Sequence, residues 1–329
     1  MTLPQIVPID HAVKEDVLFI DFSTYSTYSM CKEKDRLAHI LHLRPVIEEK
    51  PLSYGHAIHA GIAELRRKGD IDAAVQAYVQ DLIDAGSSLP ISIEDDERRS
   101  VERGEALIRA YAQRWHGEPY EVYRGSDGEP YCEIGFAMYF MDWHGRPVML
   151  AGRMDWIARS TIDQRAYQFD LKTTTSNVPQ QLKQVRPNHQ FTIYTLAAKT
   201  ILSLDLAGSY MDVVYISDRK PAVKGGPWMQ LGVDIDKDFG RQPTHRSATD
   251  IDEMMFDLIE TTRERLTWQD RLKSGEISRW PRNAPGACFQ YGGCRYLDIC
   301  STNCNPNIIA TNYIVKPWLP WQELVKKEV

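Results

Sequence analysis

The sequence predicts an α/β protein with a central mixed sheet flanked by helices, followed by a cysteine-rich module. Three observations support this prediction. Stretches with apolar residues at helical spacing come first, and three short strand-like segments follow them. A helix–strand alternation then completes a pattern typical of α/β domains. Beyond Trp280 the chain is rich in Pro, Gly and Cys, which indicates a loop-built module that binds metal.

The first part of the chain carries three predicted helices. In the first of them Ile58, Ile62 and Leu65 recur at helical spacing, which predicts one apolar face. The last is strongly charged, so we expect one of its faces to be solvated. The three predicted helices span residues 55–68, 71–85 and 97–115.

The pattern then changes to segments rich in β-forming residues and separated by turns. The predicted strands span residues 131–141, 148–158 and 166–172. After them we expect a helix over 189–202, strands over 209–216 and 228–235, and a long helix over 249–272. Helices, three successive strands, a helix and another strand predict a mixed sheet.

Composition and charge limit the class of protein. Hydrophobic residues make up 43% of the 329 residues and charged residues 26%, as in ordinary globular proteins. The sequence contains no apolar run of the ~20 residues that a membrane span needs. Residues Met1 to Asp10 lack the layout of a signal peptide, so we expect a cytoplasmic, intracellular protein. The net charge of −6 argues against nucleic-acid binding through bulk positive charge, but not through a local basic groove.

Two carboxylates on neighbouring predicted strands point to metal chemistry. Asp155 lies in or just after the second strand, and Asp170 and Lys172 lie in the third. Because strand side chains alternate, Asp170 and Lys172 share one face while Phe169 and Leu171 share the other. Paired carboxylates suit Mg²⁺ or Mn²⁺, which can polarise a phosphoryl oxygen and activate a water molecule. A nearby lysine can orient that water and offset developing negative charge.

An Asp-x-Lys sequence is also common on exposed strands, where it is only a solvated face. Other residues add to the pattern. Gln190 and Tyr194 stand four residues apart in a predicted helix and therefore share one face. His59 lies in the first predicted helix, and Glu133 lies in the first predicted strand. Each of these features is weak alone, so the order in which they occur carries the interpretation.

The ordered set resembles the RecB-like nucleases of the PD-(D/E)XK superfamily. Its members are Gly55-x-x-x-His59, Glu133, Gly152-x-x-Asp155, Asp170-x-Lys172 and Gln190-x-x-x-Tyr194. The resemblance implies a restriction-endonuclease-like core with a central mixed sheet. The Pro that usually precedes the first Asp is replaced by Met154 here, which is a departure from the superfamily pattern.

The resemblance also implies a role for each of these residues. His59, Asp155 and Asp170 would bind the metal, and the Leu171 carbonyl would add a further ligand. Lys172 would be the catalytic lysine, acting with Asp155, Asp170 and a supporting Glu133. Gln190 and Tyr194 would position DNA.

The cysteines indicate a second metal group. Five residues separate Cys288 from Cys294 and Cys294 from Cys300, while Cys31 lies far upstream. This resembles the branch of the same family in which one early and three late cysteines bind a [4Fe–4S] cluster that joins the chain ends. That branch includes recombination nuclease subunits, CRISPR adaptation nucleases and viral exonucleases. The implied ligands are Cys31, Cys288, Cys294 and Cys300, with Cys304 as the alternative to one of them.

Zinc is the competing metal for these cysteines, although structural zinc sites favour Cys-x-x-Cys pairs and the sequence has none. Cys132 stands alone beside Glu133 and is expected to be an ordinary buried thiol. The resulting division has three parts. Residues 1–130 form a helical region that contributes Cys31 and His59, 131–279 form the nuclease core, and 280–329 form the iron–sulfur module and tail.

We therefore expect a Mg²⁺- or Mn²⁺-dependent DNA exonuclease that acts on single-stranded or frayed ends in recombination, replication or repair. Tyr54, Trp156 and Tyr194 are expected to stack on bases. The sequence lacks a phosphate-binding loop, so any motor would be a separate helicase or recombination partner. The alternative is a catalytically silent DNA- or protein-binding module of nuclease fold. A nuclease whose cluster senses redox state is a third hypothesis.

Overall fold

The computed structural model describes residues 17–47, 50–88, 97–224, 226–290 and 293–317. The expectation that Met1 to Asp10 form no signal peptide, and the end of the predicted module from 318 onward, lie outside the described residues. The chain forms two compact units. Unit 1 comprises Met1–Ile47, Gly135–Gly152 and Ala248–Val329, and unit 2 comprises Glu48–Ile134 and Arg153–Ser247.

The sheet is mixed, as the sequence predicted. Its strands are β1 (Leu18–Ile20), β3 (Tyr120–Val122), β4 (Cys132–Trp143), β5 (Arg146–Ser160), β6 (Ala166–Thr174), β7 (Leu206–Tyr215) and β8 (Phe239–Thr244). The order is β1-β5-β6-β7-β8, and β3 and β4 also pair with β5. The β5–β6 and β7–β8 pairs are antiparallel, whereas the β6–β7 pair is parallel.

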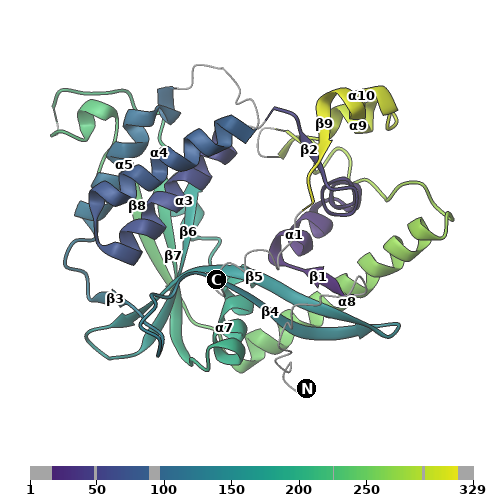
Figure 1. The fold of residues 1–329 in the computed structure, drawn as a ribbon, viewed down its shortest axis with the longest axis horizontal. Helices are drawn as coiled ribbons and strands as arrows, with labels where there is room; N and C mark the ends of the chain where they lie inside the picture. The colour runs from purple at the N-terminus through teal and green to yellow at the C-terminus, as the bar shows by residue number, and fades with distance from the viewer. Residues whose placement is uncertain (1–16, 48–49, 89–96, 225, 291–292, 318–329) are drawn as a thin grey trace. The chain divides into compact units, whose positions relative to one another are not determined.

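Helices cover both faces of the unit 2 strands. The helices are α3 (Lys50–Lys68), α4 (Ile71–Ser88), α5 (Val101–Arg114), α6 (Val178–Leu182) and α7 (His189–Ile201). Residues of α3, α4 and α5 form one core with Phe169 and Leu171 of β6 and Val214 of β7. Residues of α6 and α7 form a second core with Met211 and Val213. Figure 1 shows α3, α4 and α5 gathered beside β6, β7 and β8.

Side-chain alternation explains how β6 serves both the core and the site. Phe169 and Leu171 are each 1% exposed and pack in the first core. Phe169 stacks on Trp156 of β5, with ring centroids 5.3 Å apart and the planes 9° from parallel. Asp170 and Lys172 therefore face away from this core, as the sequence predicted.

Unit 1 is built from short elements and one long helix. These are β1, α1 (Phe22–Met30), α2 (Lys32–Asp35), the π-helical turn Arg36–Ile40, β2 (Leu43–Pro45), α8 (Ala248–Lys273), α9 (Leu297–Ser301), α10 (Pro306–Asn312) and β9 (Tyr313–Val315). β2 and β9 form an antiparallel pair, and parts of β4 and β5 also belong to this unit. Leu37, Tyr296 and Ile299 form its core, with Cys294 and Cys300 packed against it.

One predicted strand is wrong. Residues 228–235 contain the 3-10 helix Met229–Leu231, and the strand that completes the sheet is β8, farther along the chain. Gly232 has a φ of 73°, a left-handed conformation that ends the 3-10 helix and breaks any extended run. Its carbonyl accepts a 2.8 Å hydrogen bond from the buried Arg103. Apolar residues of this turn, such as Trp228 and Val233, pack against the core. Their sequence pattern therefore resembles that of a buried strand.

The other predicted elements are present, with shifted ends. The predicted helix 97–115 is a 3-10 turn, Glu97–Arg99, followed by α5, because Ser100 caps α5 and accepts a hydrogen bond from the Arg103 N–H. None of the described helices is both long and apolar enough to cross a membrane.

Candidate active site

Five elements of unit 2 carry the residues that the sequence singled out. Asp155 lies on β5, Asp170 and Lys172 lie on β6, and His59 lies on α3. Gln190 and Tyr194 lie on α7, and Glu133 lies on β4. In the β5–β6 ladder Trp156 pairs with Phe169. One residue beyond that pair, the same antiparallel register sets Asp155 beside Asp170 on the opposite face of the strands.

Lys172 links the β6 carboxylate to α7. Its Nζ lies 2.7 Å from Asp170 Oδ2 and donates a 2.8 Å hydrogen bond to Gln190 Oε1. Gln190 Nε2 in turn donates a 2.8 Å hydrogen bond to the Tyr194 hydroxyl. Asp170, Lys172, Gln190 and Tyr194 thus form one continuous polar chain, in which the amide fixes the position of the ammonium group.

Asp155 is held by the neighbouring strand and lies close to α3. The Leu171 N–H donates a 2.6 Å hydrogen bond to Asp155 Oδ2, which brings the backbone at Leu171 against this carboxylate. His59 Nδ1 lies 3.9 Å from the same oxygen. The imidazole, the Asp155 carboxylate and the Leu171 backbone are therefore neighbours.

The exposed fraction of these side chains rises from the base of the site toward the solvent. Asp170 is 1% exposed and Asp155 15%, whereas Lys172 is 27% and His59 32% exposed. Solvent therefore reaches the site past His59 and Lys172, and Asp170 lies at its base.

Burial shifts the protonation of all three predicted metal ligands. It raises the pKa of Asp170, and the Asp155 charge adds to this rise while Lys172 opposes it. Burial also raises the pKa of Asp155, against the effects of Lys172 and the Leu171 N–H. The pKa of His59 is lowered to about 3 by burial and by the positive charge of Lys172. At neutral pH the imidazole is therefore uncharged, with a lone pair available to a metal.

The donors fit a hard divalent cation. Two crowded carboxylates repel each other, which a cation between them would relieve, and a neutral imidazole adds a nitrogen ligand. As the side chains stand, no three His, Cys, Asp or Glu groups in the described part of the chain converge closely enough to form a metal site. Instead, Asp170 is paired with Lys172 and Asp155 is bound by the Leu171 N–H.

Glu133 lies beside a residue that the sequence interpretation passed over. Its carboxylate forms a 2.8 Å ion pair with Arg153 Nε, and its φ is 54°. The positive charge of Arg153 opposes the rise in the pKa of Asp155 and adds to the fall in the pKa of His59. Arg153 stands two residues before Asp155 on β5, a spacing that places both side chains on one face. That spacing was visible in the sequence and could have identified it.

The three aromatic residues expected to stack on bases are buried. Tyr54, Trp156 and Tyr194 are 1%, 2% and 6% exposed. Tyr54 and Trp156 pack in the core beneath α3, and Tyr194 accepts the hydrogen bond from Gln190. This part of the sequence interpretation is therefore wrong, because the core between α3 and the sheet contains Tyr54 and Trp156, and Tyr194 is buried beside Gln190.

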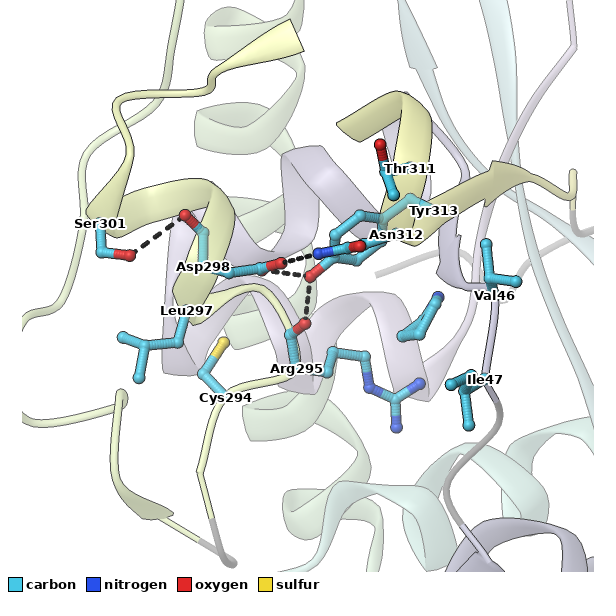
Figure 2. Close-up of a pocket in the computed structure, with 11 residues that line it drawn as sticks. Val46, Ile47, Cys294, Arg295, Leu297, Asp298, Ser301, Thr311, Asn312 and Tyr313 are labelled. Carbon is cyan, nitrogen blue, oxygen red and sulfur yellow. Dashed lines mark hydrogen bonds between the residues drawn. The ribbon is translucent and has the colours of Figure 1, made fainter. Parts of the chain in front are cut away.

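The cysteines divide between the two units. Cys132 lies in the core of unit 2, and burial raises the pKa of its thiol to about 11. Cys31, Cys288, Cys294, Cys300 and Cys304 all belong to unit 1 and are half-buried. This unit has a cavity of about 680 Å³. Cys294, Asp298 and Tyr313 are among the residues that line it (Figure 2).

Several contacts involve these thiols. Burial raises the pKa of Cys300 to about 11, with smaller effects of the same sign from Cys294 and Cys31. The Asn283 N–H lies 3.5 Å from Cys31 Sγ, and an Arg36 nitrogen lies 3.9 Å from Cys304 Sγ. Thiols from both ends of the chain are therefore neighbours within unit 1.

Comparisons with known proteins identify one family. The model of the PD-(D/E)XK nuclease superfamily matches residues 22–301, which is most of the chain. No curated protein matches significantly. One similar solved structure is described as the crystal structure of SSO0001; it is 12% identical over 72% of this chain and 86% of that chain, with a TM-score of 0.27. So loose a superposition supports no inference about fold or function.

Proposed function

The chain belongs to the PD-(D/E)XK nuclease superfamily, and on that premise we propose that it is a divalent-metal-dependent DNA exonuclease of the RecB-like branch. Superfamily membership suggests nuclease activity, for which Mg²⁺ or Mn²⁺ is the usual cofactor. The proposed substrate is DNA with single-stranded or frayed ends. A separate helicase or recombination protein would supply any unwinding.

The observation that best supports the proposal is the joint placement of His59, Asp155 and Asp170 beside the Lys172 ammonium. A catalytically silent scaffold has no physical need to bury Asp170 at 1% exposure next to a second carboxylate. Two buried carboxylates close together cost free energy unless a bound cation neutralises them or a reaction depends on them.

The proposed roles follow the geometry. His59, Asp155, Asp170 and the Leu171 carbonyl would hold the metal. A bound divalent ion would polarise a phosphate oxygen and make a coordinated water more acidic. Lys172, held by Gln190, would orient the water and offset the negative charge that develops on the phosphate. Water adds across one phosphorus–oxygen bond, so the two products end in a phosphate and a hydroxyl.

The test uses protein purified without air and single-stranded DNA labelled at its 5′ or 3′ end. Mg²⁺ or Mn²⁺ is supplied or withheld, and Asp170→Asn is compared with the wild type. We expect metal-dependent degradation that is lost in Asp170→Asn. A matched control is Asp205→Asn, because Asp205 is an exposed carboxylate of the same unit.

Circular single-stranded DNA of the same length separates exonuclease from endonuclease action. An exonuclease degrades the linear strand and leaves the circle intact, because it requires an end. Cleavage of the circle would replace the exonuclease proposal with an endonuclease. If metal-loaded wild type cuts neither substrate but still binds DNA, the catalytic proposal fails and the silent binding module takes its place.

We further propose that unit 1 binds a [4Fe–4S] cluster through Cys31, Cys288, Cys294 and Cys300, with Cys304 as the alternative ligand. The nearness of Cys31, Cys294 and Cys300 supports this proposal. A four-iron cluster takes one thiolate on each iron, so its ligands need not converge on one point as they must around a single ion. The N–H beside Cys31 and the Arg36 guanidinium beside Cys304 are suitably placed to stabilise thiolates. Zinc in place of iron on metal analysis would overturn it.

A further inference from the structure

We propose that a second pocket of unit 2 binds a segment of single-stranded nucleic acid a few nucleotides from the bond that is cut. This inference rests on the proposed nuclease function. The pocket, called here the basic pocket, has a volume of about 720 Å³. It lies among the last turn of α3, the end of α5, β3 with the loop that follows it, and Arg159 of β5.

The basic pocket concentrates positive charge in a protein whose net charge is −6. Its basic side chains are Arg66, Arg67, Lys68, Arg124 and Arg159, against the acidic Glu118 and Glu121. A local excess of basic side chains is what an acidic protein needs to hold a phosphate backbone.

Two of these basic side chains are available to a ligand. Arg66 pairs with Glu118, and Arg67 and Lys68 both pair with Glu64. Arg124 and Arg159 are exposed, and in the described part of the chain their hydrogen bonds go to the carbonyls of Gly128 and Gln164. A carbonyl carries no net charge, so both guanidinium groups can still pair with phosphates.

The wall of the basic pocket is aromatic. Trp115, Tyr120 and Tyr123 are half-buried, so part of each ring remains accessible. The Tyr120 hydroxyl is hydrogen-bonded to the Tyr210 hydroxyl at 2.6 Å, and Tyr123 stacks on Tyr131 with ring centroids 5.4 Å apart. The rings are therefore held in place before a ligand arrives. Aromatic faces combined with basic side chains are the common means of binding single strands without sequence preference.

Two elements connect the basic pocket to the candidate active site. On α3, Arg66 follows His59 by seven residues, which is about 10 Å at ~1.5 Å per residue. On β5, Arg159 follows Asp155 by four residues, which is about 13 Å at ~3.3 Å per residue. At the ~3.4 Å axial rise per nucleotide of a stacked strand, both paths correspond to roughly three or four stacked nucleotides. One strand can therefore occupy both places.

The test measures binding of fluorescent oligothymidylates of three and twelve nucleotides by anisotropy in EDTA, so that no cleavage occurs. The double variant Arg124→Glu and Arg159→Glu is compared with Lys199→Glu and Lys220→Glu. The control lysines are exposed residues of unit 2 outside the basic pocket, and both pairs change the charge equally.

We expect the pocket variant to bind the 12-mer at least tenfold more weakly than the control variant, with a smaller loss of affinity for the 3-mer, which makes fewer phosphate contacts. The slope of log affinity against log salt should fall in magnitude by about 1.4, since each single-strand phosphate contact contributes ~0.7. Equal 12-mer affinity and equal salt slope in the two double variants would overturn the inference.

Cleavage of the same oligonucleotides with Mn²⁺ separates this inference from the proposed function. If the wild type cleaves but both double variants bind and cleave alike, only the basic pocket is refuted. If the wild type cleaves nothing while the pocket variant alone loses the 12-mer, the pocket stands and the nuclease proposal fails.

Discussion

At the scale of single residues, the proposed site would give Lys172 two roles that oppose each other. Its ammonium lies 2.7 Å from Asp170, so it would compete with a bound divalent cation for the same carboxylate. Gln190 holds it in place through a 2.8 Å hydrogen bond. A lysine placed only to stabilise the fold would not need to reduce the affinity of a metal site. Its position is explained if it acts on the reacting phosphate.

We therefore expect Lys172→Met to separate catalysis from metal binding. Cleavage should fall by about 10²–10³-fold, as for the loss of one group that stabilises developing charge. Mn²⁺ should bind at least as tightly as in the wild type, because the competing ammonium is gone. Single-turnover cleavage and titration calorimetry measure the two effects, with Lys199→Met as the control. Weaker Mn²⁺ binding in Lys172→Met would contradict this division of roles.

The sequence predicted much of the site because two periodicities are local. Alternation placed Asp170 and Lys172 on one face of β6, and the four-residue spacing placed Gln190 beside Tyr194. The approach of His59 to Asp155 depends on how α3 packs on the sheet, so only the family resemblance indicated it. The wrong assignment of Tyr54 to base stacking has the same origin, since composition does not tell a core ring from an exposed one.

At the scale of elements, the π-helical turn Arg36–Ile40 of unit 1 contains His39, whose pKa lies far below that of a free histidine. Burial lowers the pKa of His39 to about 3, and Arg265 of α8, Arg44 of β2 and His42 contribute smaller effects of the same sign. Unfolded histidine has a pKa near ~6.5. Between pH 6.5 and 3 the folded protein therefore binds fewer protons here than the unfolded chain does, and stability falls as the pH falls.

The expected result is that His39→Gln reduces the acid sensitivity of the fold. When the pH is lowered from 7.5 to 5.0, the melting temperature of the wild type should fall further than that of His39→Gln. The reason is that only the wild type gains a proton at this position on unfolding. The opposite effect of Asp35, whose pKa burial raises to about 6, is present in both proteins and cancels. Exposed His116→Gln should behave like the wild type. Equal losses for wild type and His39→Gln would refute the assignment.

Long elements were predictable, whereas short ones depended on tertiary contacts. The helices α3, α4, α7 and α8 and the strands β4 to β7 have residue periodicity over many positions. Short elements such as β1, β2 and β9 have only three residues, too few to show any period, and exist because a partner strand pairs with them. The error at 228–235 is of the same kind, since Gly232 turns the chain where the apolar pattern alone predicts a strand.

At the scale of the whole molecule, the candidate active site and most of the cysteines belong to different units. The residues of the candidate active site and the basic pocket are in unit 2, and every cysteine except Cys132 is in unit 1. Unit 1 is assembled from three separate chain segments, and 200 residues (48–247) separate its first segment from its last, so the two must be brought together across that length. Closing so long a loop carries a large entropic cost, of the order of 5 kcal/mol, which a cross-link through metal would offset.

Loss of the proposed cluster should consequently loosen unit 1 and spare unit 2. In the double variant Cys300→Ser and Cys304→Ser, which also removes the alternative ligand, iron should fall well below about four atoms per chain. Backbone amides of α1, α9 and α10 should then exchange hydrogen faster, while those of α3 and α5 keep their protection, because unit 2 has its own hydrophobic core. Cys132→Ser, which changes a thiol in that core, should keep its iron. Unchanged iron in the double variant Cys300→Ser and Cys304→Ser, or equal loss of protection in both units, would show that a cluster bound by these cysteines does not hold the chain ends together.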